Sequence, residues 1–228
     1  MAAEAYGPIL EVACGTGRIT LPLAQAGFEI TAIDLSEGML SVAKAKAQAL
    51  PLACQQRIEW LCQDMAALSL DRSFAFAFVP FRSFQHLLSI ADQRKTLSAL
   101  RAHLAPGGRL ALHLFDPRLD LLLKGGTAIP QSISLDEVTG RRFLAEVLRT
   151  DFDYMAQVRR DLWRYAEIDE NGDTLREDIR EMALRWTHRW ELYHLLALMG
   201  FTVEAEYSDF KGTSPSYGNE LIVVCKAN

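Results

Sequence analysis

One segment near the start of the chain constrains the fold more than any other. Ile9–Ala13 is an apolar run interrupted by Glu11, and Gly15 and Gly17 follow it before a stretch of helical character. A strand that turns through glycines into a helix is how α/β proteins present main-chain N–H groups to a nucleotide-like ligand. An ordinary tight turn is the alternative, but we expect a ligand at this point.

A second apolar run ends in a carboxylate. Ile30–Asp34 places Asp34 17 residues after Gly17, where a strand-end carboxylate can accept hydrogen bonds from both ribose hydroxyls. The two segments indicate a nucleoside-bearing cofactor. A dinucleotide fingerprint requires a third glycine where this chain has Thr20. An NAD(P)-dependent oxidoreductase is therefore a disfavoured alternative.

The same segments resemble two motifs of class I S-adenosylmethionine-dependent methyltransferases. The first motif is an acid followed by a G-x-G turn, here Glu11, Gly15 and Gly17, and the second corresponds to Asp34–Ala43. S-adenosyl-L-methionine has a positive sulfonium and no phosphate, so an acid beside the turn suits it better than a dinucleotide. The resemblance implies that this compound is the cofactor and that the protein is a methyltransferase.

The resemblance also implies further cofactor contacts at the expected strand ends. Glu11 would help to position the methionine amino end, whereas Asp64 and Met65 would meet the adenine. The alternatives are a helix-terminal charge for Asp34 and a simple cap for Asp64. The full set of expected cofactor contacts is Glu11, Ala13, Gly15, Gly17, Arg18, Asp34, Leu35, Met39, Asp64, Met65 and Val79.

Catalytic residues are less well defined. Methyl transfer is an in-line displacement that needs the acceptor about 3–3.5 Å from the methyl carbon and, for an ammonium or hydroxyl acceptor, a group that takes a proton. Many relatives place an acidic or aromatic residue after the fourth strand, where this chain has Val79-Pro80-Phe81 and no acid. His86 and Asp116 are the remaining candidates. Their alternatives are a structural histidine, as for His113, and a turn former.

The first half of the chain alternates strands with helices, which predicts right-handed βαβ units and a parallel sheet. The resemblance implies a Rossmann-like, doubly wound, seven-stranded, mostly parallel sheet with an antiparallel last strand. The expected strands are Ile9–Ala13, Glu29–Asp34, Ile58–Gln63, Phe74–Val79, Arg109–Phe115, Phe201–Tyr207 and Glu220–Lys226. The expected helices are Gly17–Gln25, Ser36–Leu50, Ser83–Ile90 and Asp92–Leu104, followed by one that ends at Gly200.

Between residues 117 and 189 the pattern changes. Phe143–Asp151, Gln157–Glu167 and Leu175–Trp186 alternate polar and apolar residues, and Asn171-Gly172 is a strong hairpin signal. We expect an antiparallel β-sheet inserted into a core of residues 1–116 and 190–228. Its layout is similar to the cap of methyltransferases that act on small amines and amino sugars. This similarity implies a lid over the substrate, with a dimer interface as the alternative.

The composition of the chain limits the classes of partner that we expect. The net charge is −5, which argues against a nucleic-acid substrate. The four cysteines have no metal-ligand spacing, which predicts no metal site and suits a reducing cytosol. No apolar run approaches the length of a membrane span and no cationic leader is evident. We expect a cytoplasmic enzyme with a small-molecule substrate.

The leading interpretation is methyl transfer to a nitrogen or oxygen atom of a small molecule. A catalytically degenerate methyltransferase fold that only binds ligands is the alternative. Two features motivate that alternative: the absent acid after the fourth strand, and the eight residues before the first strand, where related enzymes carry helices that help to close the pocket.

Overall fold

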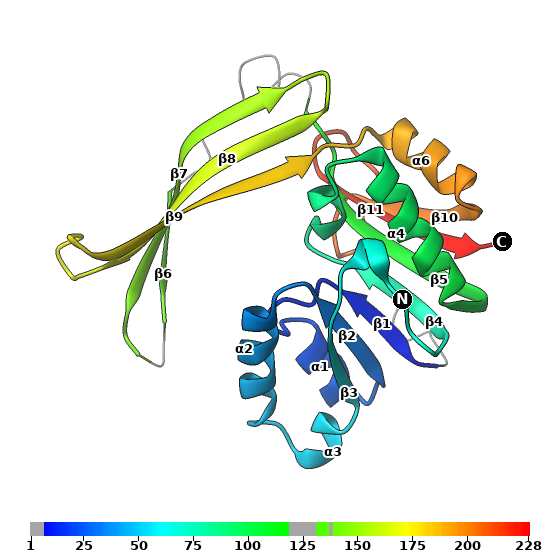
Figure 1. Ribbon diagram of the computed structural model, residues 1–228, viewed down its shortest axis with the longest axis horizontal. Coiled ribbons are helices and arrows are strands. Elements are labelled where there is room, and N and C mark those ends of the chain that lie inside the picture. Colours follow the sequence, from blue (N-terminus) through cyan, green and yellow to red (C-terminus); the bar gives the residue numbers. More distant parts are fainter. Residues whose placement is uncertain (1–6, 119–130, 137–138) are drawn as a thin grey trace. The chain divides into compact units, whose positions relative to one another are not determined.

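The computed structural model describes residues 7–118, 131–136 and 139–228 (Figure 1). The chain forms two compact units. One runs to Asp116 and resumes at His188–Asn228, and the other is Pro117–Thr187. Within the described residues, no helix is both long and apolar enough to cross a membrane.

The first unit is built on a seven-stranded sheet with the order β10-β11-β5-β4-β1-β2-β3. β11 pairs antiparallel with both of its neighbours, and β1 to β5 pair parallel to one another. The fold class predicted from the sequence is therefore confirmed. The strands are β1 (Ile9–Val12), β2 (Ile30–Asp34), β3 (Ile58–Cys62), β4 (Phe74–Val79), β5 (Leu104–Phe115), β10 (Phe201–Tyr207) and β11 (Glu220–Ala227).

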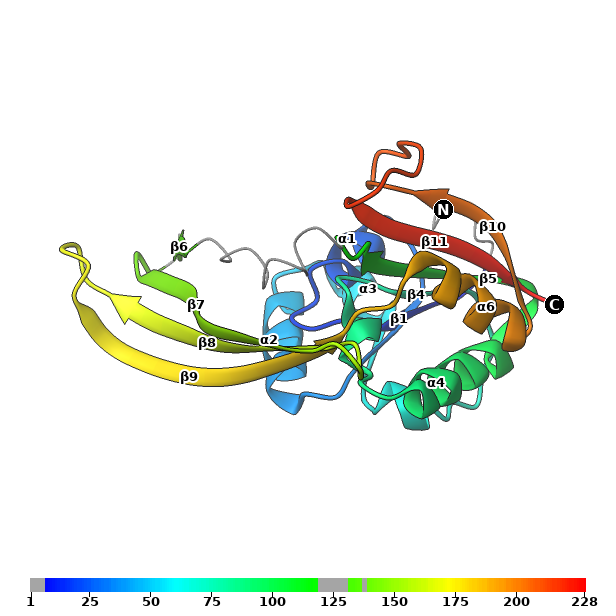
Figure 2. The same cartoon turned by 90° about the horizontal axis from the view of Figure 1, so that it is seen from above.

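Helices cover both faces of this sheet (Figures 1 and 2). The larger core cluster joins one face to α4 (Ile90–Ala102) and α6 (Arg189–Leu198). The smaller cluster joins the other face to α1 (Thr20–Gln25) and α2 (Glu37–Ala47). The remaining short elements are α3 (Leu52–Gln55) and the 3₁₀ helices η2 (Met65–Ala67) and η3 (Ser83–His86).

The central strands are mostly apolar because both faces of the sheet are covered. All four residues of β1 and five of the six in β4 are buried, as is typical of central strands in a parallel sheet. β1 and β4 are neighbours in the sheet. From β1 the chain adds β2 and β3 on one side, and it then crosses over to add β4 and β5 on the other side. Their carboxyl ends therefore flank the topological switch point, where open α/β sheets bind ligands.

Two helix predictions need correction. The helix expected at Ser83–Ile90 is only the 3₁₀ turn η3, and α4 begins at Ile90 because the Ser89 hydroxyl accepts the Asp92 N–H at 3.0 Å. The first helix begins at Thr20 rather than Gly17, since Gly17 has a φ of +79° that no α-helix accommodates.

The second unit is a four-stranded antiparallel sheet with the order β6-β7-β8-β9. Its strands are β6 (Ser132–Leu135), β7 (Arg142–Asp153), β8 (Val158–Ile168) and β9 (Thr174–Arg185). The hairpin expected at Asn171-Gly172 joins β8 to β9. Strand β6 was not predicted: its sequence alternates polar and apolar residues, but it is only four residues long and all four are exposed.

Candidate functional site

The turn after β1 is held open by left-handed backbone. Ala13, Gly15 and Gly17 have φ values of +60°, +57° and +79°, and the Cys14 N–H donates to the Ile33 carbonyl at 2.9 Å. A Cβ on Gly15 would meet no atom within 4 Å, whereas one on Gly17 would lie 3.2 Å from the Trp60 ring. One side of the turn is therefore packed and the other is open for a ligand to approach the main chain.

Asp34 lies beside the open side of this turn. Its Oδ2 accepts the Gly15 N–H at 2.8 Å and its Oδ1 accepts the Ser36 N–H at 2.9 Å. These two bonds fix the carboxylate at the tip of β2. A carboxylate has about four acceptor positions, so two remain for the hydroxyls of a ribose.

Glu11 lies beneath the turn rather than at its surface. Its side chain is 1% exposed, and its Oε2 accepts a hydrogen bond from the Thr20 hydroxyl at 2.5 Å. Burial raises the pKa of Glu11 to about 7, the Thr20 hydrogen bond opposes this shift, and the nearby charge of Asp34 adds to it. From this position Glu11 is better placed to support the glycine turn than to make the direct ligand contact that the resemblance implies.

Further expected cofactor contacts follow β2 and β3, and among them Asp64 and Met65 are the two expected to meet the adenine. Leu35 and Met39 are 71% and 48% exposed, and the Ser36 hydroxyl accepts the Met39 N–H at the start of α2. Asp64 caps η2 by accepting the Ala66 N–H at 2.8 Å. Met65 is half-buried against the larger core. The capping alternative for Asp64 is thus present, and its cofactor contact remains a prediction.

The stretch Val79-Pro80-Phe81, which the sequence favours as an apolar pocket wall, presents an aromatic ring at the tip of β4. Val79 is fully buried in the core, so its side chain cannot face a ligand directly. Phe81 is 47% exposed, and the Arg18 guanidinium lies 5.1 Å from the centre of its ring. Arg18 follows β1 and Phe81 follows β4, so this cation–π contact spans the switch point.

The two catalytic candidates have different surroundings. His86 is exposed at the end of η3. Asp116 is 8% exposed, and its Oδ2 accepts from Arg189 Nη2 at 3.2 Å and from the Gly218 N–H at 3.3 Å. Arg189 also pairs with Glu206, and these two side chains are 24% and 9% exposed. Asp116 therefore belongs to a partly buried ion-pair network.

Residues 9–108 match a family model described as a methyltransferase domain. The matched segment is therefore similar to a methyltransferase domain. Its order of glycine turn, strand-end Asp34 and parallel strands is that of class I S-adenosylmethionine-dependent methyltransferases, as the resemblance implied.

Curated and solved relatives agree with this assignment. YqeM of Bacillus subtilis (strain 168), which is named as a methyltransferase, is 40% identical over 111 residues, 48% of this chain and 42% of YqeM. The chain spans less than half the length of the curated relatives that it matches. The CcbJ methyltransferase of Streptomyces caelestis has a TM-score of 0.80 at 23% identity, over 99% of this chain and 86% of CcbJ.

A third relative is CalS10 of Micromonospora echinaspora, whose structure contains S-adenosylmethionine. It is described as an amino pentose methyltransferase involved in calicheamicin biosynthesis. Its TM-score is 0.70 at 23% identity, over 100% of this chain and 86% of CalS10. At this identity the two solved structures establish a shared fold.

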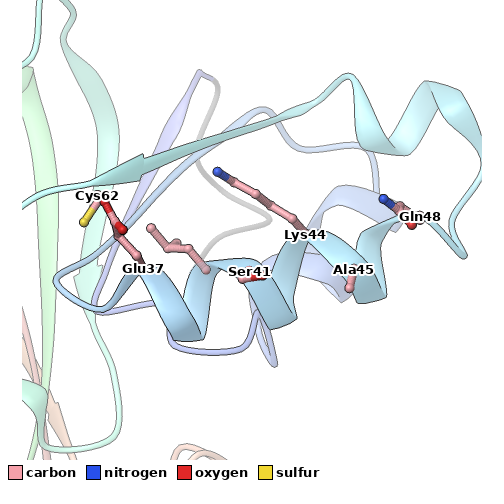
Figure 3. Close-up of a pocket in the computed structure, with 7 residues that line it drawn as sticks. Glu37, Ser41, Lys44, Ala45, Gln48 and Cys62 are labelled. Atoms are coloured by element: carbon pink, nitrogen blue, oxygen red, sulfur yellow. The ribbon is translucent and has the colours of Figure 1, made fainter.

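A separate hollow of about 480 Å³ lies along α2 of the first unit. It is lined by Glu37, Leu40, Ser41, Lys44, Ala45, Gln48 and Cys62, and Figure 3 shows Lys44 reaching from α2 into the space beside β3. Neither Gly15 nor Asp34 lines it. Among residues 7–118, 131–136 and 139–228, no three His, Cys, Asp or Glu side chains form a group that could hold a metal ion.

Proposed function

We propose that the protein is an S-adenosylmethionine-dependent methyltransferase that acts on a nitrogen or oxygen atom of a small molecule. The observation that carries the proposal is the hydrogen bond from the Gly15 N–H to Asp34 Oδ2. It joins an open glycine turn to a fixed carboxylate on the neighbouring strand, as a nucleoside site requires.

The residues at the strand tips fit the cofactor. The open face of Gly15 would admit the ligand close to the main chain, Asp34 would accept the ribose hydroxyls, and the exposed side chains of Leu35 and Met39 would pack on the adenine. Ala13, Gly17, Arg18, Asp64 and Met65 would complete the binding surface. When bound, S-adenosylmethionine supplies a methyl group that a sulfonium has already activated.

The chain's own contribution to catalysis is then mainly position. Holding the acceptor on the axis of the breaking bond supplies several kcal/mol without a protein nucleophile. We propose His86 as the group that takes the acceptor's proton, because it is exposed near the tip of β4. Asp116 is less suited, since it is only 8% exposed and its Oδ2 already accepts from Arg189 and Gly218.

An amine or hydroxyl on a small molecule is the acceptor that best fits these observations. The name of CalS10 as an amino pentose methyltransferase supports this substrate class. The Arg18 guanidinium over the Phe81 ring adds support, because an aromatic face that binds a guanidinium also suits a substituted ammonium.

We propose that the inserted sheet contacts the substrate, with a homodimer interface as its alternative role. Leu175 and Ile179 both lie on β9 and are both exposed. Leu175→Asp and Ile179→Asp should leave the mass in solution unchanged and weaken acceptor binding if the sheet serves the substrate. A halved mass by analytical ultracentrifugation would assign the sheet to dimerisation instead.

Isothermal titration with S-adenosylmethionine and S-adenosylhomocysteine tests the proposed cofactor. We expect saturable binding of both compounds. The absence of heat with either compound, on protein shown to be folded by circular dichroism, would refute the proposal.

A ligand-binding protein with a degenerate methyltransferase fold is the second candidate. It is favoured by the absence of an acid in Val79-Pro80-Phe81, at the tip of β4. A methyl-transfer assay across a pool of amines and phenols separates the two candidates. Cofactor binding without turnover of any pool member would support the degenerate protein.

A further inference from the structure

Two consecutive residues after β4 have left-handed backbone. Phe81 and Arg82 have φ values of +51° and +66°, and neither is a glycine. Left-handed backbone is unfavourable for residues that carry a Cβ atom. Strained conformations persist only where the surrounding structure specifies them, and they cluster at functional sites. The contacts that specify this turn therefore bear on function.

Both main-chain N–H groups of the turn donate hydrogen bonds to one residue of β5. The Phe81 N–H donates to His113 Nδ1 at 3.0 Å, and the Arg82 N–H donates to the His113 carbonyl at 3.0 Å. His113 is only 7% exposed. Because Nδ1 accepts, the neutral ring carries its proton on Nε2.

A carboxylate on β11 completes the arrangement. His113 Nε2 lies 2.9 Å from Glu220 Oε2, and Arg82 Nη2 donates to Glu220 Oε1 at 2.7 Å. Burial alone would raise the pKa of Glu220, but the hydrogen bonds from His113 and Arg82 lower it overall. The three residues form a closed ring of contacts that links the turn to β5 and β11.

Two exposed aromatic rings flank His113. Phe210, which is 69% exposed, meets the imidazole edge-on with ring centres 4.8 Å apart, and Phe81 meets it at 6.1 Å. Phe81 in turn lies under the Arg18 guanidinium that follows the glycine turn. The orientation of Phe81 at the switch point is thus coupled through its own N–H to the imidazole of His113.

We propose that His113 is a positioning residue of the methyl-transfer site, which holds the Phe81–Arg82 turn so that the Phe81 ring lines the ligand crevice. The proposal rests on the proposed function. The group that acts is Nδ1 as a hydrogen-bond acceptor, and Glu220 maintains that tautomer by accepting from Nε2.

Two matched substitutions separate the two ring nitrogens. His113→Asn places an amide oxygen near the position of Nδ1 and loses the contact with Glu220. His113→Gln reaches toward the position of Nε2 and loses the acceptor for the Phe81 N–H. If Nδ1 acts as proposed, the Asn variant preserves the turn and the Gln variant does not.

Nuclear magnetic resonance on the full chain supplies the first readout. In the unsubstituted protein we expect the ring nitrogens of His113 to report a proton on Nε2. Exchange of the Phe81 amide with solvent should accelerate at least tenfold in His113→Gln and less than threefold in His113→Asn. A proton on Nδ1, or equal exchange in the two variants, would overturn the proposal.

The second readout connects the turn to the ligand. Saturating S-adenosylhomocysteine should shift the Phe81 amide resonance in the unsubstituted protein and in His113→Asn. In His113→Gln we expect that shift to be lost although the compound still binds. Equal shifts in both variants would count against His113. A failure of the unsubstituted protein to bind the compound would instead refute the proposed function, and the tautomer measurement would still decide the role of Nδ1.

Discussion

Asp116 and Arg189 form an ion pair at the two points where the chain leaves and re-enters the seven-stranded unit. The distance from Asp116 Oδ2 to Arg189 Nη2 is 3.2 Å, and the side chains are 7% and 24% exposed. Asp116 is the last residue before the inserted unit, and Arg189 begins α6 just after it. The pair ties together two chain segments that are 73 residues apart.

We expect Asp116→Asn to lower the free energy of unfolding by about 1–3 kcal/mol, because a buried charged partner of Arg189 is lost. Affinity for S-adenosylhomocysteine should not change. Urea titration and calorimetry measure the two quantities. The control Glu204→Gln breaks the more exposed pair with Arg109 and should cost less than about 1 kcal/mol. Loss of methyl transfer at unchanged stability would restore the catalytic role that the sequence predicted for Asp116.

Asp34→Ala should weaken binding of S-adenosylhomocysteine by at least about tenfold, since hydrogen bonds to a charged acceptor are each worth about 1.5–3 kcal/mol. The substitution also leaves the Gly15 and Ser36 N–H groups without their acceptor. Isothermal titration measures the affinity. Asp92→Ala removes an exposed carboxylate near the start of α4 and should bind normally. Equal affinities of the two variants would remove Asp34 from the site.

Gly15→Ala should weaken cofactor binding, in free energy, by more than it lowers the free energy of unfolding. The new methyl group would meet no protein atom, so it would occupy the open side of the turn. The left-handed backbone adds a cost of about 1 kcal/mol to folding. Gly27→Ala is a matched control, because Gly27 has a φ of +97° and similarly open surroundings after α1. A similar loss of stability in both variants, with weaker binding only in Gly15→Ala, is the expected result.

Glu11 should make stability depend on pH. Its pKa of about 7 in the folded chain exceeds its ordinary value of 4.5, so the folded state binds more protons than the unfolded state between these values. Stability therefore falls as the pH rises through this window. Glu11→Gln removes the titration, and its stability relative to the unsubstituted chain should rise by about 1–3 kcal/mol from pH 4.5 to pH 8.

Urea titrations at several pH values measure this difference. Glu29→Gln is the control, because the Glu29 side chain is 71% exposed and should add no pH dependence in this window. A constant difference between Glu11→Gln and the unsubstituted chain from pH 4.5 to pH 8 would show that Glu11 titrates near its ordinary value.

The sequence predicted most of the fold because its main signals are local. Continuous apolar runs such as Phe74–Val79 identify buried parallel strands, and Asn171-Gly172 identifies a hairpin. Errors arose where packing outweighs local pattern. The start of α4 depends on which residue caps it, and Ser89 does so rather than Asp92. Strand β6 is only four residues long and is fully exposed.

In the candidate site, too, the residues with a local sequence signal were predictable and the long-range contacts were not. Gly15 and Asp34 stand out because each follows an apolar run that predicts a strand, and the structure brings them to a 2.8 Å hydrogen bond. Phe81 and His113 were not recognised as partners. They are 32 residues apart, and no local spacing indicates that a main-chain N–H just after β4 meets an imidazole on β5.

The sequence by itself determined the strand–turn–helix unit, the carboxylate that follows it and the order of elements, since each depends on residues close together in the chain. Only the tertiary structure decided that Glu11 is buried with a raised pKa, that Asp116 pairs with Arg189, and that His113 holds the turn after β4. Burial and the pairing of side chains depend on which distant segments pack together. A periodic pattern specifies which face of an element is covered, but not which side chain covers it.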